Sequence, residues 1–248
     1  MESLVYYWNT LFLPSDVTPD LTFIISVGVM AGKKGVKYKN PRATNPTKLN
    51  VTLTSVQQDI VVGTLLGDAT MERTHENHNA RLIMDQTFPT HAGYLTTLYV
   101  HLMNLVKTCP RVIIRKPDIR TGNTYSSMVF KTMALPCLTV FHKLFYVNGR
   151  KVVPDNIWHL LTPRALAYWI MDDGGKGSYN EMILHTRSFT LQEVKLLQSV
   201  LQGKYQLRTR LVEKTPGQWV IVISVKQVHP LKDIVAPYMS RDMLYKLH

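Results

Sequence analysis

An internal repeat constrains the fold of this chain more strongly than any other feature of its sequence. Within the 248 residues, one order of expected helices and strands occurs twice, over about residues 54–148 and again from residue 162 to the end. Two copies of one supersecondary unit predict a molecule with two similar halves and approximate twofold symmetry. A chain of this length can bury a substantial core in that arrangement.

Two pairs of residues align the copies. Asp68 and Asp173 lie at an offset of 105 residues, and Phe88 and Phe189 lie at an offset of 101. Because these offsets differ by only four residues, the elements recur in the same order, with a slightly longer hairpin in the first copy. A pseudo-twofold protein of this kind suits a nucleic-acid duplex, whose backbone has approximate twofold symmetry of its own.

Each copy is expected to have the element order αββαββα. In the first copy, apolar spacing and turn residues predict helices at 56–68, 94–106 and 136–145, strands at 81–88, 112–114 and 125–131, and a turn at Gly122-Asn123. In the second, they predict helices at 163–173 and from Thr190, strands at 182–189, 207–212 and 219–225, and a last helical segment interrupted by Pro230 and Pro237. The expected fold class is therefore α+β with antiparallel sheets.

Local signals support two of these helix starts. Thr162 is expected to cap the helix that begins at Pro163, and Glu193 stands at the capping-box position of the helix after Thr190. The chain is accordingly expected to divide into an N-terminal extension at 1–53, a first half at 54–150 and a second half at 151–248.

The charge of the chain indicates the kind of partner. A formal net charge of +12 and a pI near 9.7 predict attraction to a polyanion, either nucleic acid or an anionic membrane surface. The longest apolar run, residues 21–30, is about half the length that a membrane-spanning helix needs. We therefore expect a nucleic acid and no membrane. The two cysteines fit no metal-ligand spacing and indicate a reducing compartment.

The N-terminal extension contains a basic segment without acidic residues. Its cations are Lys33, Lys34, Lys37, Lys39, Arg42 and Lys48. Interleaved proline and asparagine favour an extended arm, which is open to two interpretations: a solvated tail or an arm that follows DNA. Residues 1–13 have neither the basic start of a secretory signal nor the arginines of an import presequence, so the protein is expected to act where it is made.

Two apolar helices are expected to end in aspartate. Residues 61–69 contain Asp68, and residues 166–174 contain Asp172 and Asp173. Carboxylates at a helix carboxyl end are disfavoured by about 0.3–1 kcal/mol each, because the macrodipole is already negative there. One such end is an ordinary helix exit, but two at equivalent positions favour a divalent cation, and oxygen ligands suit Mg²⁺.

The spacing of two glycines supports the pairing of these helices. Gly63 and Gly67 lie four residues apart on one helical face, where they would let a second backbone approach closely. If the two helices pack together, Asp68 and Asp173 meet near the pseudo-twofold axis.

The two segments resemble the paired LAGLIDADG motifs of single-chain, intron-encoded homing endonucleases. The resemblance continues through residues 166–176, 186–190 and 242–247, and it covers about residues 54–248 without the N-terminal extension. It implies that the motif helices form the interface between two αββαββα halves. It also implies that the antiparallel sheets form a saddle that binds the DNA major groove.

The resemblance further implies the residues of an active site. Asp68 and Asp173 match the metal-binding acids, with the carbonyls of Gly67 and Asp172 as auxiliary ligands. The implied catalytic set is completed by Lys151, Lys246 and Gln86, and the expected metal is Mg²⁺, whose sites Mn²⁺ or Ca²⁺ can occupy. Bound metals supply activated water and leaving-group stabilisation for phosphodiester hydrolysis. The second copy departs from the family pattern, since Arg187 stands where a glutamine is expected.

Cations in or beside the expected strands are candidates for DNA contact. They are Arg81, Arg115, Lys116, Arg120, Lys131, Lys176, Arg187, Arg208, Arg210 and Lys214. Alternation along a strand places only some of them on the groove face. Arginine can bind guanine through two hydrogen bonds, whereas lysine more often neutralises phosphate.

Three functions remain open at this point. The first is site-specific cleavage of a long double-stranded DNA target by a monomer with pseudo-twofold symmetry, which the retention of both aspartates and both lysines favours. The second is an RNA maturase that assists intron splicing on the same fold. The third is a generic nucleic-acid-binding module. The expected location is the interior of a mitochondrion or chloroplast, with the protein encoded there.

Overall fold

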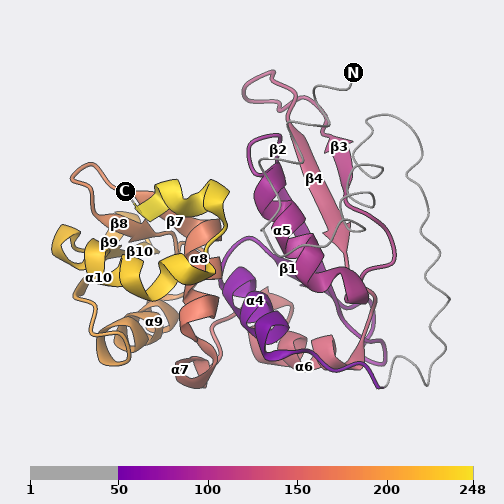
Figure 1. Ribbon diagram of the computed structural model, residues 1–248, viewed down its shortest axis with the longest axis horizontal. Helices are drawn as coiled ribbons and strands as arrows, with labels where there is room; N and C mark the ends of the chain where they lie inside the picture. The colour runs from indigo at the N-terminus through magenta and orange to yellow at the C-terminus, as the bar shows by residue number, and fades with distance from the viewer. Residues whose placement is uncertain (1–49, 248) are drawn as a thin grey trace. The chain divides into compact units, whose positions relative to one another are not determined.

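A computed structural model describes residues 50–247 of the chain (Figure 1). All six cations of the predicted basic arm, from Lys33 to Lys48, lie outside the described residues. The described chain divides into two compact units. Unit 1 comprises residues 83–133, and unit 2 comprises residues 50–82 together with residues 134–247.

The element order αββαββα occurs twice, as the sequence predicts. The first copy consists of α4 (Ser55–Leu66), β1 (Thr70–Glu72), β2 (Arg81–Phe88), α5 (Ala92–Leu102), β3 (Arg111–Ile114), β4 (Ser126–Lys131) and α6 (Pro136–Phe145). The second consists of α8 (Pro163–Asp173), β7 (Gly174–Lys176), β8 (Met182–Leu184), α9 (Leu191–Gly203), β9 (Thr209–Thr215), β10 (Gln218–Ile223) and α10 (Val225–Val235). The α+β class with antiparallel sheets is confirmed.

Shorter elements connect and complete these copies. They are the 3-10 helix η1 (Met103–Leu105), the strands β5 (Tyr146–Val147) and β6 (Arg150–Lys151), the helix α7 (Ile157–Leu160), and the 3-10 helices η2 (Ala236–Tyr238) and η3 (Arg241–Leu247). None of the helices in residues 50–247 has the length and apolar character needed to cross a bilayer.

Unit 1 contains most of β2 together with β4 and β3, which pair antiparallel in that order. Gln86 lies opposite Met128, so alternation places both side chains on one face and Asp85 on the other. Helix α5 packs against β4 (Figure 1), and its Leu95 and Leu98 are buried. The apolar face of this sheet is therefore covered by a helix.

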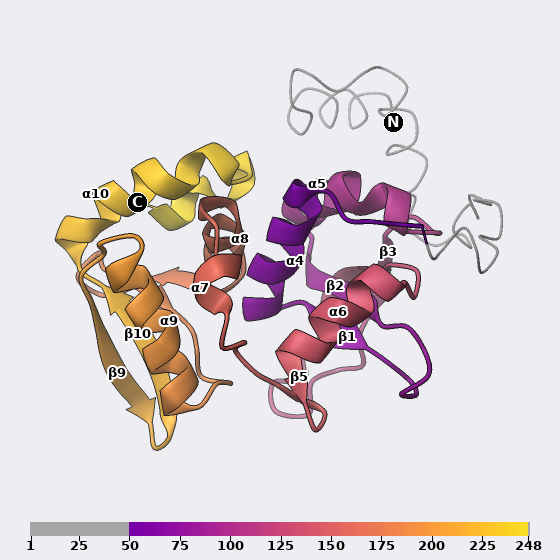
Figure 2. The same ribbon diagram turned by 90° about the horizontal axis from the view of Figure 1, so that it is seen from below.

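Unit 2 contains both motif helices, α4 and α8, packed against each other. Helix α8 ends at Asp173 as predicted, whereas α4 ends at Leu66, two residues before Asp68. The four-stranded antiparallel sheet of unit 2 has the order β7-β8-β10-β9. Helix α9 lies along β9 and β10 (Figure 2), while α10 packs on α8. Trp169 of α8 and Ile221 of β10 are fully buried, which places the core of the unit around the second motif helix and its sheet.

Two expectations about the second copy are wrong. The strand predicted at 182–189 ends at Leu184, because the Thr186 hydroxyl donates to the carbonyl of Trp219 and the Phe189 N–H closes a turn on the carbonyl of Thr186. Pro230 does not interrupt the last helix but lies inside α10. It is the sixth of the eleven residues of that helix, where its missing N–H removes a single backbone hydrogen bond.

Candidate active site

Both motif helices, α4 and α8, begin with a side-chain cap. The Thr54 hydroxyl accepts from the N–H of Gln57 at 3.2 Å, and the Gln57 side chain accepts from the N–H of Thr54 at 3.1 Å. Thr162 caps α8 by accepting from the N–H of Ala165 at 3.1 Å, as predicted. Each cap satisfies helix N–H groups that would otherwise lack partners. The caps therefore fix where the two helices start. The length of each helix then determines the position of the aspartates at its carboxyl end.

Glycine lets the two helices approach closely. A Cβ atom added to Gly63 would lie 2.2 Å from the carbonyl oxygen of Ala165 and 2.7 Å from Cβ of Tyr168. A Cβ added to Gly67 would lie 2.4 Å from Cβ of Asp172. These separations are shorter than any tolerated contact, so α8 occupies the space that side chains at both glycines would need. The close approach predicted from Gly63 and Gly67 is present.

The facing positions of the two helices are equivalent in the repeat. Three pairs of residues share the offset of 105 residues: Asp59 with Arg164, Gly63 with Tyr168, and Gly67 with Asp172. In the first pair, Nη1 of Arg164 lies 3.3 Å from Oδ2 of Asp59. Positions that are equivalent in the repeat therefore carry complementary rather than identical side chains: an acid faces a base, and glycine faces a larger residue.

The aspartates lie together at the carboxyl ends of the helices. Asp173 is the last residue of α8, and Asp68 follows Gly67, the cap residue of α4. The N–H of Asp68 donates to Oδ2 of Asp172 at 3.2 Å, which links the end of one motif helix to the end of the other. The structure thus gathers three carboxylates, those of Asp68, Asp172 and Asp173, at one end of the helix pair.

Lys151 reaches the end of α4 from the hairpin of β5 and β6. The turn of this hairpin is Asn148-Gly149, with φ angles of +51° and +76° that suit a two-residue turn between antiparallel strands. Nζ of Lys151 donates to the carbonyls of Gly67 at 2.7 Å and Ala69 at 2.8 Å. The ammonium group therefore lies on the two residues that flank Asp68.

Lys246 makes the corresponding contact with α8. Its Nζ donates to the carbonyls of Met171 and, at 3.0 Å, Asp172. The side chain comes from η3 and is 9% exposed. Each motif helix thus ends against one lysine, and each ammonium charge offsets the negative end of its helix dipole.

Burial and mutual repulsion set the charges of this cluster. Burial raises the pKa of Asp173, the negative charge of Asp68 raises it further, and Lys151 and Lys246 lower it, which leaves a pKa of about 7. Burial lowers the pKa of Lys151 to about 8 against the opposing charges of Asp173, Asp172 and Asp68. Burial likewise lowers the pKa of Lys246, opposed by the same carboxylates. The two lysines therefore neutralise the carboxylates only in part.

The chemistry of the cluster fits a hard divalent cation. The carboxylates of Asp68 and Asp173 offer the oxygen ligands that such a cation prefers. A cation beside Asp173 would oppose the burial and the charge of Asp68 that raise its pKa. Within residues 50–247, no three His, Cys, Asp or Glu side chains are grouped so as to hold a metal ion by themselves. Mg²⁺ commonly completes its octahedron with water and substrate phosphate, so a partial protein site suits it.

The two carbonyls expected as auxiliary ligands have other partners here. The carbonyl of Gly67 accepts from Lys151, and the carbonyl of Asp172 accepts from Lys246. A carbonyl oxygen has two lone pairs, so these hydrogen bonds do not exhaust it. The ligand roles of Gly67 and Asp172 stay predictions.

The candidate DNA contacts in unit 2 are mostly exposed. Lys176, Arg187, Arg208, Arg210 and Lys214 are solvent-exposed, and Arg210 lies 3.6 Å from Glu181. Arg81 is partly buried in an ion pair with Glu72 at 2.7 Å. The five exposed cations are therefore accessible to a polyanion.

The candidates of unit 1 fall at two places. Lys116 and Arg120 are exposed in the loop between β3 and β4, where Arg115 pairs with Asp85. Lys131 lies opposite Ile83 and shares the sheet face of Asp85, away from the helix-covered side. These placements put two candidates in one exposed loop and Lys131 on the sheet face away from α5.

Gln86 lies on the helix-covered face of unit 1, where it is 7% exposed. Its Oε1 atom lies 3.1 Å from Nδ1 of His91. Gln86 belongs to unit 1, whereas the aspartates and lysines belong to unit 2. Its expected catalytic role stays a prediction.

Sequence reasoning missed one contact of a predicted residue, Asp172, and one further residue, His185. The carboxylate of Asp172 bonds the N–H of Asp68, although only the carbonyl of Asp172 was expected to take part. The N–H of His185 donates to the carbonyl of Asp173 at 3.1 Å. Burial lowers the pKa of the His185 imidazole, and the nearby charges of Arg187, Lys246 and Lys214 lower it further. In the repeat, the position of Asp172 corresponds to that of Gly67. This difference was the signal in the sequence that the two halves of the site carry different side chains.

Two copies of αββαββα, with paired helices that end in a shared acidic cluster, define a two-motif protein of the LAGLIDADG class. Comparison with known families agrees with this class. The model of the LAGLIDADG DNA endonuclease family matches residues 58–231. The chain belongs to this family, with both motifs in one polypeptide.

Several curated proteins are similar to the chain. A cytochrome b mRNA maturase bI2 from Debaryomyces hansenii is 33% identical over 196 residues, which is 76% of this chain and 72% of the relative. A probable intron-encoded endonuclease 1 from Wickerhamomyces canadensis is 28% identical, covering 79% of this chain and 85% of the relative. The DNA endonuclease I-ChuI of Chlamydomonas applanata is 29% identical, covering 79% of this chain and 96% of the relative.

A solved structure shares the fold. The homing endonuclease I-WcaI, bound to its DNA recognition sequence, matches with a TM-score of 0.75 and 23% sequence identity. The match covers 97% of this chain and 96% of that chain.

Proposed function

We propose that the protein is a site-specific endonuclease that cleaves both strands of a long double-stranded DNA target in intron homing. The observation that carries the proposal is the meeting of Asp68, Asp172 and Asp173 at the ends of two packed helices, with a lysine on each end. Family membership and a net charge of +12 support it. A chain with two motifs needs no second copy, so the proposed active form is a monomer.

Asp68 and Asp173 would hold Mg²⁺ through their carboxylates. The bound ion would activate water and stabilise the leaving oxygen of the phosphodiester. Lys151 and Lys246 keep positive charge at the helix ends, where it can stabilise the extra negative charge of a phosphate under attack. Lys151 comes from the segment between the two copies, and Lys246 comes from η3 after the second copy. The end of each motif helix therefore has its own cation.

Recognition of the target would fall to the exposed cations. In unit 2 these are Lys176, Arg187, Arg208, Arg210 and Lys214, and in unit 1 they are Arg115, Lys116 and Arg120. Arginine is suited to paired hydrogen bonds with guanine, and lysine to phosphate neutralisation. Contacts with many phosphates would make affinity fall steeply with salt concentration.

A second function has a specific observation in its favour. Two similar proteins, from Debaryomyces hansenii and Saccharomyces cerevisiae, carry the name cytochrome b mRNA maturase bI2, at 33% and 27% identity. An RNA maturase on the same fold is therefore the alternative, with folded intron RNA as its partner. The names of these relatives also support a location inside an organelle, which is part of the proposal.

The test is cleavage of a randomised library of long DNA duplexes by the purified protein with Mg²⁺. Discrete cuts at one related set of sites would support the endonuclease and give its target. If a folded protein binds intron RNA more tightly than duplex DNA and makes no metal-dependent cut, the maturase is the better assignment.

A further inference from the structure

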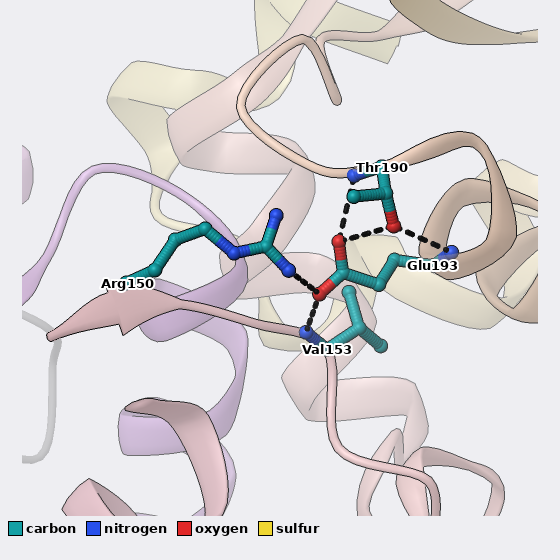
Figure 3. Close-up of polar contacts among 4 residues, drawn as sticks. All are labelled: Arg150, Val153, Thr190 and Glu193. Atoms are coloured by element: carbon teal, nitrogen blue, oxygen red, sulfur yellow. Dashed lines mark hydrogen bonds and ion pairs between the residues drawn. The ribbon is translucent and has the colours of Figure 1, made fainter. Parts of the chain in front are cut away.

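The carboxylate of Glu193 receives four hydrogen bonds (Figure 3). Oε2 accepts from the N–H and the hydroxyl of Thr190, each at 2.6 Å. Oε1 accepts from the guanidinium of Arg150 at 3.1 Å and from the N–H of Val153 at 3.2 Å. The side chain is 13% exposed, so these four donors replace most of its contact with water.

The two oxygens have different tasks. Oε2 completes the capping box of α9 with Thr190, as the sequence predicts. A capping box leaves the second oxygen free, yet Oε1 binds two residues of the segment that joins the copies. Capping of α9 therefore accounts for only half of the contacts of Glu193.

The segment bound by Oε1 carries Lys151. Arg150 precedes Lys151 directly and binds Oε1 through its guanidinium, whereas Val153 follows Lys151 by two residues and binds Oε1 through its backbone N–H. Glu193 therefore contacts the chain on both sides of the lysine, through a side chain before it and the backbone after it. The Asn148-Gly149 turn fixes the other end of the hairpin. From this backbone, Nζ of Lys151 reaches the carbonyls of Gly67 and Ala69.

The charge of Glu193 is maintained in this setting. Burial alone would raise its pKa, but hydrogen bonds from Thr190 and Val153 and the charge of Arg150 bring the pKa below its usual value. A charged acceptor forms stronger hydrogen bonds than a neutral one.

The first copy has no counterpart of this contact. At the offset of 101 residues, Glu193 corresponds to Ala92 and Thr190 to Pro89. The His91 residue that precedes α5 makes no capping hydrogen bond through its side chain. The first copy therefore offers no carboxylate at this position that could act on Lys246 as Glu193 acts on Lys151. Lys246 thus serves as an internal control for Lys151.

We propose that Glu193 is a positioning residue for Lys151: by binding Arg150 and Val153, it holds the lysine amine against the carboxyl end of α4, beside Asp68. The catalytic consequence rests on the proposed endonuclease function. The positioning itself is a property of the protein without metal or DNA, so it can be tested even if the chain proves not to cut DNA.

The experiment is competitive acylation of the full chain without metal or DNA, with the modified lysines quantified by mass spectrometry. Glu193→Gln retains a residue type that capping boxes accept and removes the charge that binds Arg150. We expect Lys151 to be acylated several-fold faster in Glu193→Gln than in the wild type, with Lys246 unchanged, because the freed amine becomes accessible.

Thr190→Ala is the matched control. It removes the hydroxyl of the capping box and leaves the Arg150 and Val153 contacts of Glu193 in place, so it should lower the melting temperature without changing acylation of Lys151. An unchanged Lys151 rate in folded Glu193→Gln, or equal increases at Lys151 and Lys246, would overturn the proposal. If Glu193→Gln does not fold, Arg150→Gln breaks the same ion pair from its exposed side, with the same two outcomes.

Activity gives a second readout once a target is known. Glu193→Gln should lower the rate of cleavage at saturating DNA by about tenfold and leave DNA affinity unchanged, because misplacement of a catalytic group affects the chemical step. Thr190→Ala should change neither quantity. Loss of affinity with an unchanged cleavage rate would contradict a positioning role.

Discussion

Asp59 and Arg164 occupy equivalent positions in the two motif helices, 105 residues apart, and their side chains form an ion pair across the helix interface. In a pair of identical helices, the same position would bring two acids or two bases together. The Gly63–Tyr168 and Gly67–Asp172 contacts follow the same rule, with a small residue facing a large one. Helix α4 is therefore shaped to pair with α8 rather than with a second α4.

Charge reversal tests this complementarity. Asp59→Arg places two bases together and Arg164→Asp two acids, so each should lower the free energy of unfolding by about 1–2 kcal/mol. The double reversal, Asp59→Arg with Arg164→Asp, restores opposite charges and should regain at least half of the summed loss. Chemical denaturation of the four proteins measures the coupling. Additive losses in the double variant would show that the two side chains do not interact.

Gly63→Ala should destabilise the protein. Alanine in place of glycine inside a helix ordinarily stabilises by roughly 0.5–1 kcal/mol. Here the added Cβ would lie 2.2 Å from the carbonyl oxygen of Ala165, so we expect a loss of about 1–3 kcal/mol instead. Ser55→Ala, at the exposed start of the same helix, is the control. A thermal-unfolding midpoint equal to or above the wild type would contradict the close approach of the helices.

The pKa of Asp173 predicts an unusual pH dependence of stability. Burial and the charge of Asp68 raise its pKa from 3.8 to about 7, so the folded protein binds a proton more tightly than the unfolded chain does. The stability that comes from this protonation is complete below the unfolded pKa of 3.8 and is lost as pH rises through 7.

Asp173→Asn removes this dependence. Without metal, the variant should be more stable than the wild type at pH 8, by about 1–3 kcal/mol, and the difference should narrow toward pH 5. Thermal unfolding in a chelator across this range is the measurement. Asp233→Asn, which changes an exposed aspartate of α10, should show no such difference. A wild type that is more stable than Asp173→Asn at pH 8 would contradict the raised pKa.

Metal binding should reverse that order of stabilities. A cation that binds the folded state stabilises it by mass action, by about 2.7 kcal/mol at one hundred times its Kd. Millimolar Mg²⁺ or Ca²⁺ should therefore raise the melting temperature of the wild type and of Asp233→Asn. The double variant that carries both Asp68→Asn and Asp173→Asn should show no such increase in melting temperature. An equal increase in that double variant would place the metal elsewhere.

Local sequence signals predicted much of the fold. Helices α6 and α8 begin and end where expected, because each starts with a proline in its first turn and continues with a helical apolar period. The capping box of Thr190 and Glu193 was also predicted and is present. Signals of this kind depend on neighbouring residues, so they can be recognised in a single sequence.

The remaining features depend on partners that are distant in the chain. Lys151 bonds the carbonyl of Gly67 across 84 residues, and the second oxygen of Glu193 binds Val153 across 40 residues. Strand β8 ends early because Thr186 bonds the carbonyl of Trp219. No period or composition encodes such pairings. The resemblance to a family indicated the lysines, but only the structure shows what holds them.

Cleavage of the selected DNA target by Asp68→Asn and Asp173→Asn tests the central claim most directly. Wild type and Asp233→Asn are compared with these variants in Mg²⁺, and affinity for the same duplex is measured alongside. We predict that both active-site variants lose double-strand cleavage by at least about a hundredfold and keep most of their DNA affinity, because each would lack a proposed ligand of the metal. Undiminished cleavage by either variant would contradict the assignment of that aspartate and the account built on it.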